Sequence, residues 1–277
     1  METTVGSWLE MATALLTRVG IGTAHLDALV LLEDCLHQDR AKLLAHPETK
    51  LSDAHIVHLT ERLQRRAGHE PMAYLRGKTE FYGRPFYIDH RVLEPRPESE
   101  TMIDMLKKLF KRPGYANGWT IIDVGTGSGA LAITAKLELP KAEVMATDVD
   151  PECIKVAEEN CQTYHCDVHF LKGDLLKPLY MHYHPEQSVL LCNLPYVPDH
   201  FQINPAAMQE PRIAIFGGPD GLDVYRKLFE QIDPLAYKPQ YLLTEAMPPQ
   251  QELLASIASS HGYRLHKTED FIQLFIR

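Results

Sequence analysis

The stretch that decides the fold runs from Thr120 to Ala130 and reads Thr-Ile-Ile-Asp-Val-Gly-Thr-Gly-Ser-Gly-Ala. Its first half, residues 120–124, is a short apolar run typical of a buried strand. The glycines at 125, 127 and 129 follow at once, and glycine lets a backbone turn sharply and approach a ligand closely. A strand that runs directly into such a loop predicts a binding turn for a nucleoside-containing cofactor in an α/β fold.

Strands and helices alternate through the rest of this part of the chain. Predicted strands are 120–124, 143–147, 168–171, 188–192, 240–244, 262–266 and 271–276, and predicted helices lie near 129–138, 151–163, 221–236 and 249–260. This alternation predicts a doubly wound, mainly parallel, seven-stranded sheet with helices on both faces. Ligands of such sheets bind at the carboxyl ends of the strands, where the strand order reverses.

Acidic residues stand at two further strand ends. Asp148 follows the second strand at the distance suited to ribose hydroxyls, and Asp174 follows the third, where it suits an exocyclic amine with Leu175 packed on the ring. Gly125-x-Gly127-x-x-Ala130 also satisfies the dinucleotide fingerprint, so the loop alone does not separate NAD from another nucleoside cofactor. The loop and the two carboxylates together predict a nucleoside cofactor.

The tetrapeptide Asn193-Leu194-Pro195-Tyr196 closes the apolar run 188–192. The Asn193 side-chain oxygen and the next backbone carbonyl offer two acceptors beside an aromatic ring, which suits a flat NH2 group. An ordinary strand-ending turn is the alternative. A hydride-transferring enzyme would need an acid or base here, and none stands out. A methyl donor needs only an aligned nucleophile, which two acceptors can orient and stabilise as nitrogen becomes positive.

The first 70 residues predict a small helical bundle. Gly20-Ile21-Gly22 ends a first helix, Thr23 is the expected N-cap of a second, and Ser52-Asp53 opens a third that ends near Gly68. A β-hairpin is expected at 79–88 with Gly83-Arg84 between its strands. The bundle shows no catalytic constellation, so it is structural or holds a protein partner.

Composition limits the remaining classes of function. The 277 residues carry a net charge of −9, with 45% hydrophobic and 23% charged residues. No run of 18 apolar residues or signal peptide occurs, so we expect a cytoplasmic protein without a membrane span. The acidic balance argues against direct nucleic-acid binding. We expect no metal, because Cys161, His165, Cys166 and His169 fit no common zinc spacing.

Several motifs resemble one family of class I S-adenosylmethionine methyltransferases. These are Pro71-Met72-Ala73-Tyr74-Leu75, Pro95-Arg96-Pro97-Glu98-Ser99-Glu100, the glycine loop, Glu210-Pro211-Arg212, and Phe216-Gly217-Gly218-x-Asp220-Gly221-Leu222. Together they are similar to the HemK/PrmC family, the protein-(glutamine-N5) methyltransferases of peptide-chain release factors. The resemblance covers nearly the whole chain, and the Arg-Pro-Glu and Gly-Gly-x-Asp-Gly-Leu stretches are its most diagnostic parts.

The resemblance implies a reaction and a set of site residues. The cofactor would be S-adenosylmethionine and the product S-adenosylhomocysteine. The cofactor-binding residues would be Gly125, Thr126, Gly127, Ser128, Gly129, Asp148, Asp174, Leu175 and Asn193. The catalytic residues would be Asn193, Pro195 and Tyr196, and with Leu194 they would grip the glutamine of a Gly-Gly-Gln loop. We expect a monomer with a docking bundle at 1–75, a hairpin linker at 76–97 and a methyltransferase domain at 98–277.

The sequence departs from the family pattern at the tetrapeptide. The family usually has Asn-Pro-Pro-Tyr, and Leu194 replaces the first proline. Asn-Leu-Pro-Tyr also resembles the rRNA adenine-N6 dimethyltransferases, so adenine-N6 methylation of RNA or DNA is the alternative. The stretches 245–250 and 268–273 lack the glycines usual in the family. A second alternative is a non-catalytic scaffold that binds a release factor, which the intact Asn193-x-Pro195-Tyr196 argues against.

Overall fold

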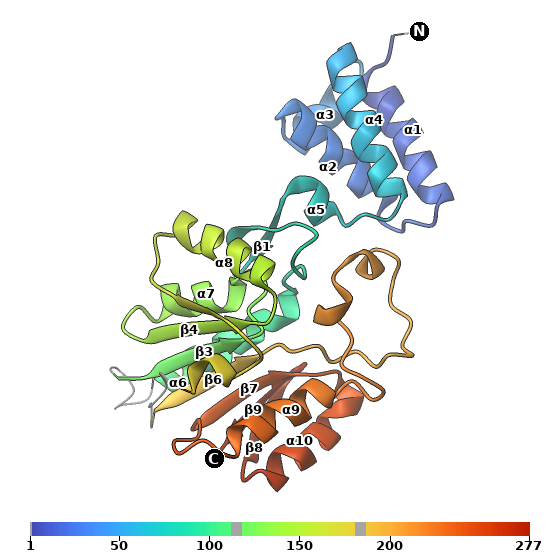
Figure 1. Ribbon diagram of the computed structural model, residues 1–277. Coiled ribbons are helices and arrows are strands. Elements are labelled where there is room, and N and C mark those ends of the chain that lie inside the picture. Colours follow the sequence, from blue (N-terminus) through green and yellow to red (C-terminus); the bar gives the residue numbers. More distant parts are fainter. Residues whose placement is uncertain (1, 112–117, 181–186) are drawn as a thin grey trace. The chain divides into compact units, whose positions relative to one another are not determined.

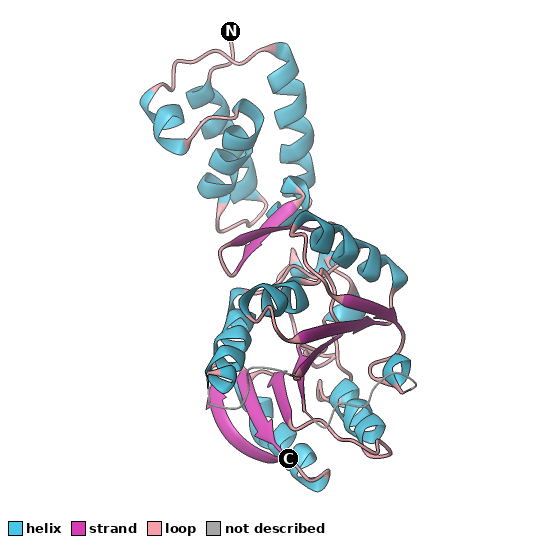
Figure 2. Ribbon diagram, turned by 90° about the vertical axis from the view of Figure 1, so that its left-hand side faces the viewer, coloured by secondary structure: helices cyan, strands magenta, loops and turns pink. Residues whose placement is uncertain are grey.

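The computed structural model describes residues 2–111, 118–180 and 187–277 (Figures 1 and 2). The chain forms two compact units. The first contains Met1–Gly77 together with the short segment Asn204–Gln209, and the second contains Lys78–Ile203 and Glu210–Arg277. Within the described residues, no helix is long and apolar enough to cross a membrane.

The first unit is a bundle of short helices. Capping residues set where its helices begin: Thr4 and Ser7 form a capping box at the first helix, and the Ser52 hydroxyl accepts a hydrogen bond from His55 N at the fourth. The helices are α1 (Val5–Arg18), α2 (Ala24–Leu36), α3 (Arg40–Ala45), α4 (Asp53–Ala67), α5 (Met72–Arg76) and the 3-10 turn η3 (Ala207–Gln209). The predicted bundle is confirmed, but α3 and α5 are additional because five or six residues are too few for a periodic pattern.

The bundle core surrounds one buried ion pair. Trp8, Leu31 and Leu59 are fully buried there. Asp27 accepts hydrogen bonds from Arg66 Nε at 2.8 Å and from the Thr23 hydroxyl at 2.9 Å. Thr23 does precede α2, but its side chain makes no cap bond to the helix backbone. Thr23 is therefore the N-cap residue of α2, as predicted, but its hydroxyl donates to Asp27 and does not accept from the helix backbone.

The hairpin begins the second unit. Strands β1 (Lys78–Phe81) and β2 (Arg84–Tyr87) pair antiparallel. The turn is Tyr82-Gly83, with φ of 54° and 69°, one residue earlier than the predicted Gly83-Arg84. A two-residue turn with positive φ at both positions matches the strand twist, and Gly83 must take its second position.

The main sheet has seven strands in the order β5-β4-β3-β6-β7-β9-β8. Five strands are parallel, and β9 is antiparallel to both of its neighbours. The strands are β3 (Thr120–Val124), β4 (Glu143–Asp148), β5 (His169–Lys172), β6 (Ser188–Cys192), β7 (Tyr241–Glu245), β8 (Arg264–Glu269) and β9 (Ile272–Ile276). The predicted mainly parallel, seven-stranded sheet is confirmed.

Helices cover both faces of this sheet, as Figure 1 shows for α7 and α8 on one side and α9 and α10 on the other. Alternate strand residues face two separate cores: Ile121 packs with the helices of one face and Ile122 with those of the other. The helices are α6 (Glu100–Phe110), α7 (Ala130–Glu138), α8 (Pro151–Thr163), α9 (Asp223–Ile232) and α10 (Gln251–Ser260), with 3-10 turns η1 (Pro97–Ser99), η2 (Lys177–Leu179), η4 (Arg212–Ala214) and η5 (Pro248–Gln250).

The strand order reverses at β3. The chain goes from β3 outward to β4 and β5, then returns to the other side of β3 with β6. The carboxyl ends of these parallel strands share one edge of the sheet, and a crevice forms there by geometry alone. The glycine loop, Asp148, Asp174 and Asn193 all follow strands at this edge.

Candidate active site

The glycine loop turns tightly after β3. Gly125, Gly127 and Gly129 have φ of 76°, 54° and 80°. Residues other than glycine rarely adopt these positive φ angles. The amides of Gly125 and Thr126 donate to Thr147 O at 2.8 and 2.9 Å, so the loop is fastened to the end of β4. At Gly129 a Cβ would also lie only 3.0 Å from the Ala157 Cβ. Glycine is therefore required there by conformation and by packing.

Asp123, in the strand that precedes the loop, holds the loop in place. Its Oδ2 accepts from the Thr126 hydroxyl at 2.6 Å and from Ala132 N at 3.1 Å. Its Oδ1 is buried without a hydrogen-bond partner among the described residues. Burial raises the pKa of Asp123 to about 7, despite these two hydrogen bonds. The sequence prediction gave Asp123 no role in the site, although it begins the loop motif.

Asp148 ends β4 beside the loop. Its Oδ2 accepts from Gly127 N at 2.9 Å and its Oδ1 from Asp150 N at 2.9 Å. Burial raises the pKa of the Asp148 carboxyl, and the backbone N–H donors partly offset that effect. The carboxylate is thus fixed by the loop, with its remaining lone pairs available to ligand hydroxyls.

Asp174 follows β5 in a constrained loop. A Cβ on Gly173 would lie 2.2 Å from the Pro178 Cγ, and Leu175 itself adopts φ of 53°. Asp174 pairs with Lys177 and Lys227, both at 2.8 Å. Burial alone would raise the pKa of Asp174, but the two lysines lower it. The carboxylate is ionised and already paired.

One cavity joins these strand ends to the tetrapeptide. Of the predicted site residues, it is lined by Gly125, Gly127, Asp148, Asp174, Leu175, Asn193, Leu194 and Pro195. Thr126, Ser128, Gly129 and Tyr196 do not line it: the first three belong to the glycine loop, and the Tyr196 hydroxyl donates to the buried Glu245. The prediction missed other lining residues, among them Arg91, Leu93, Cys153, Ile213, Val224 and Lys227.

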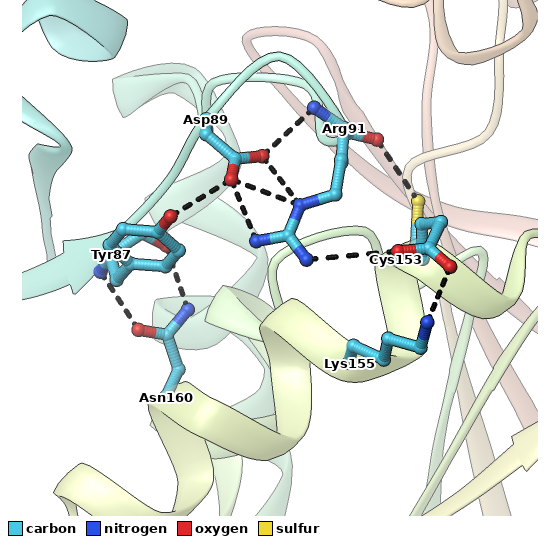
Figure 3. A network of polar contacts seen from close by, with 7 residues as sticks. Tyr87, Asp89, Arg91, Cys153, Lys155 and Asn160 are labelled. Carbon is cyan, nitrogen blue, oxygen red and sulfur yellow. Dashed lines mark hydrogen bonds and ion pairs between the residues drawn. The ribbon is translucent and has the colours of Figure 1, made fainter.

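Arg91 reaches the cavity because a polar network fastens the segment after the hairpin to α8 (Figure 3). Asp89 binds the Arg91 guanidinium at 2.7 and 2.9 Å, and Arg91 O accepts from the Cys153 thiol at 3.4 Å. Asn160 bonds both the N–H and the carbonyl of Tyr87, at 2.8 and 2.9 Å. The Arg91 bonds outweigh burial and hold the pKa of Asp89 at about 2. The hairpin linker therefore supplies one wall of the cavity.

Asn193 is held in a chain of hydrogen bonds. Its Nδ2 donates to the Ser99 Oγ at 2.8 Å, and the Ser99 hydroxyl donates to Glu245 Oε2 at 2.6 Å. The Tyr196 hydroxyl donates to Glu245 Oε1 at 3.0 Å. Glu245 is 0% exposed, and burial raises its pKa against the effect of these two donors. The sequence prediction missed both Ser99 and Glu245.

The Gly-Gly-x-Asp-Gly-Leu loop supports the backbone of the tetrapeptide. Gly217 N donates to Val197 O at 2.9 Å, and Val197 N donates to Ile215 O at 2.9 Å. The Gln250 side-chain amide donates to Tyr196 O at 2.7 Å and to Asp220 O at 2.8 Å. A Cβ on Gly221 would lie 2.1 Å from Tyr196 O. Glycine is thus required at position 221 by contact with the backbone of Tyr196.

Two further residues tie the site together. Glu210 accepts from Arg96 Nη2 at 2.5 Å and from Glu94 N at 3.0 Å, which joins the Arg-Pro-Glu segment to the loop after the tetrapeptide. The buried Tyr225 hydroxyl shares its proton between the carbonyls of Cys192 and Glu245, at 2.8 and 2.6 Å. These contacts fix the ends of β6 and β7 against each other.

Comparison with known proteins gives matches over both units. Residues 7–77 match the PrmC N-terminal domain, and residues 100–194 match ribosomal protein L11 methyltransferase (PrmA). The release factor glutamine methyltransferase of Deinococcus radiodurans is 33% identical, covering 95% of this chain and 92% of the relative. Those of Coxiella burnetii and Moorella thermoacetica are 32% and 37% identical, covering 87% and 76% of this chain and 86% and 73% of theirs.

Solved structures resemble the chain at lower identity. The hMettl16 catalytic domain in complex with MAT2A 3'UTR hairpin 6 has a TM-score of 0.53 at 15% identity, covering 81% of both chains. The T. thermophilus 16S rRNA N2 G1207 methyltransferase (RsmC), in complex with AdoMet and guanosine, has a TM-score of 0.51 at 16% identity and covers 72% of this chain and 49% of its own. Similarity at this level establishes the fold alone.

The sheet order and the strand-end cavity define a class I methyltransferase fold. Within that class, the extent of the match to the curated relatives settles the family. The chain belongs to the release factor glutamine methyltransferases.

Proposed function

We propose that this protein transfers a methyl group from S-adenosylmethionine to the side-chain N5 of the glutamine in the Gly-Gly-Gln loop of a peptide-chain release factor. One observation carries the proposal: the Asn193 amide opens onto the same cavity as Asp148 and Asp174, with its Nδ2 already bonded to Ser99. The names of relatives that are 32–37% identical favour this activity over adenine methylation or a non-catalytic scaffold.

The residues around the cavity suit S-adenosylmethionine. Asp148 offers carboxylate lone pairs for ribose hydroxyls, and Asp174 and Leu175 offer an acceptor and an apolar surface for an adenine ring. The backbone at Gly125 and Gly127 carries no side chain, so a ligand can approach it closely. The cofactor supplies an electrophilic methyl group. We propose that the chemistry needs no metal ion.

The tetrapeptide would activate the substrate amide. The lone pair of an amide nitrogen is delocalised, so the nitrogen is a weak nucleophile. Asn193 Oδ1 and the Leu194 carbonyl accept hydrogen bonds from its two N–H groups, orient it, and stabilise the positive charge that grows on nitrogen. The nitrogen gains the methyl group and then loses a proton, which becomes acidic only at that stage. The ring of Tyr196 would pack against the planar amide.

The helical unit is proposed to dock the release factor, residues 76–97 to form a hairpin linker, and residues 98–277 to form the methyltransferase domain. We further propose a cytoplasmic monomer that makes no direct contact with nucleic acid. The net charge of −9 supports the last point, because phosphate-backbone binding requires a basic surface.

A labelled-methyl assay tests the proposed function. Purified protein is incubated with labelled S-adenosylmethionine and, in separate reactions, with release factor, with release factor whose Gly-Gly-Gln glutamine is replaced by alanine, and with RNA. Label is expected only on the unmodified release factor. Label on RNA alone would support adenine methylation, and binding of release factor without label on any substrate would support the scaffold.

A further inference from the structure

Ser99, Asn193 and Glu245 come from three separate elements and meet through their side chains. Ser99 ends η1, Asn193 follows β6, and Glu245 is the last residue of β7. Ser99 is 2% exposed and Glu245 is 0% exposed, so water does not compete for the bonds between them. Neither side chain lines the cavity, and any effect on the reaction must pass through Asn193 or Tyr196.

When Glu245 is ionised, the order of donors and acceptors in this chain has one consistent solution. An ionised carboxylate can only accept, so the Ser99 hydroxyl must donate its single proton to Glu245. The Ser99 oxygen can then only accept from its other neighbour, and that neighbour must present the Asn193 NH2 end. Because Nδ2 and Oδ1 are opposite ends of one planar amide, Oδ1 is turned away from Ser99 and toward the substrate side. An inverted amide would present NH2 to an NH2 substrate.

The second oxygen of Glu245 holds the side chain of Tyr196. The Tyr196 hydroxyl donates to Glu245 Oε1, while Ser99 uses Oε2. One buried carboxylate thus accepts directly from the Tyr196 hydroxyl and holds the Asn193 amide through Ser99. The ring of Tyr196 cannot turn away without leaving a buried carboxylate oxygen unpaired, which is costly.

We propose that Glu245, acting through Ser99 and Tyr196, is the positioning residue that sets the hydrogen-bond direction of the substrate-amide pocket. This inference rests on the proposed function. The charged and titratable groups near Glu245 are Glu98, which raises its pKa, Arg96, which lowers it, and the hydroxyls of Tyr196 and Tyr225. A protonated Glu245 would donate to one of its two partners and could then reverse the direction of the Ser99 bond.

Kinetics of three variants test this role. Ser99→Ala removes the connection, and Glu245→Gln places an NH2 donor where one of the two acceptors stood. Each is expected to lower kcat about 10- to 100-fold, the value of one lost charge-assisted bond in the transition state, with KM for release factor and Kd for S-adenosylmethionine changed less than about threefold. Thr244→Val is the matched control: Thr244 precedes Glu245, is buried, and has no hydrogen-bond partner for its hydroxyl in the described residues. It should keep full activity.

The pH profile separates positioning from simple structural support. Wild-type kcat should fall at acidic pH as Glu245 becomes protonated, and this acid limb should be absent in Glu245→Gln. Wild-type kcat in either Ser99→Ala or Glu245→Gln would overturn the proposal. So would equal losses of kcat, cofactor affinity and melting temperature, because these would indicate general loosening of the fold.

A spectroscopic readout keeps the inference testable if release factor is not methylated and the proposed function fails. The side-chain 15N resonance of Asn193, assigned by its loss in Asn193→Ala, should shift with the titration of Glu245 in the wild type. The shift should disappear in Ser99→Ala and remain in Thr244→Val. A titration that survives in Ser99→Ala would show that Asn193 is not linked to Glu245 through Ser99.

Discussion

Gly217 lies directly against the carbonyl of Pro195. A Cβ at position 217 would be 2.3 Å from Pro195 O and equally close to Gly221 O, a separation that real Cβ atoms do not reach. The glycine-rich loop before α9 therefore packs directly against the backbone of the tetrapeptide that contains Asn193. The position of the tetrapeptide therefore depends on a residue that has no side chain.

Gly217→Ala tests the contact between this loop and the tetrapeptide. The new methyl group must displace either the tetrapeptide or the loop, so we expect kcat to fall at least about 10-fold and the free energy of unfolding to drop by about 1–3 kcal/mol. Gly22→Ala is the control, because a Cβ there meets nothing within 4 Å. Steady-state kinetics and urea unfolding measure both effects. Unchanged kcat in Gly217→Ala would show that the tetrapeptide tolerates displacement.

Asn193→Ala tests the separation between substrate activation and cofactor binding. Removal of the side-chain acceptor should lower kcat by about 10²- to 10³-fold, as loss of one preorganised transition-state partner does elsewhere. Calorimetric titration should show S-adenosylmethionine affinity within about threefold of the wild type, because the glycine loop, Asp148 and Asp174 are intact. A large loss of cofactor affinity would instead assign Asn193 to cofactor binding.

Tyr225→Phe tests how far the strand ends depend on one hydroxyl. The change leaves the buried carbonyls of Cys192 and Glu245 without this donor, and we expect the free energy of unfolding to fall by about 1–3 kcal/mol, together with kcat. Tyr263→Phe is the matched control, since its buried hydroxyl donates to Pro239 O on a different part of the unit. The control should lose comparable stability in urea and retain kcat. Equal kcat in the two variants would show that the Tyr225 hydroxyl does not support the site.

Asp123→Asn should change how stability depends on pH. The Asp123 pKa is about 7 in the folded protein, above its unfolded value of 3.8. A raised carboxyl pKa gives stability that is fully present below the unfolded pKa and is lost as pH rises through the folded pKa. Unfolding free energy of the wild type, relative to the variant, should therefore decline between about pH 4 and pH 7, by at most about 4 kcal/mol.

The asparagine variant is a fair comparison because one Asp123 oxygen accepts both existing bonds, and the Asn carbonyl can replace it. Urea unfolding at several pH values measures the difference. A wild-type–variant difference that stays constant from pH 4 to pH 8 would mean that Asp123 keeps an ordinary pKa.

The fold and one side of the site followed from local pattern. Short apolar runs alternating with helical periodicity located the seven strands, and the rule that ligands bind at carboxyl ends of parallel strands brought Asp148, Asp174 and Asn193 to one edge. The hairpin turn lies one residue earlier than predicted, because Tyr82 adopts a positive φ. Nothing about a tyrosine side chain indicates a positive φ.

Side-chain bonds between distant segments could not be predicted in this way. Ser99 and Asn193 are 94 residues apart, and Ser99 and Glu245 are 146 apart. Ser99 did lie in the diagnostic Arg-Pro-Glu segment and Glu245 at a strand end, so both positions carried a signal. Periodicity records which face a residue occupies, and it contains no information about which distant partner a polar side chain meets.

The assignment of Asn204–Gln209 to the helical unit has a consequence for how the protein can be divided. The chain passes between the units three times, after residues 77, 203 and 209. A truncation at residue 77 would leave this segment without the unit it packs in, only eight residues beyond Tyr196 in the chain. The helical unit therefore cannot be removed by a single cut in the chain, because it includes part of the loop that follows Asn193-Leu194-Pro195-Tyr196.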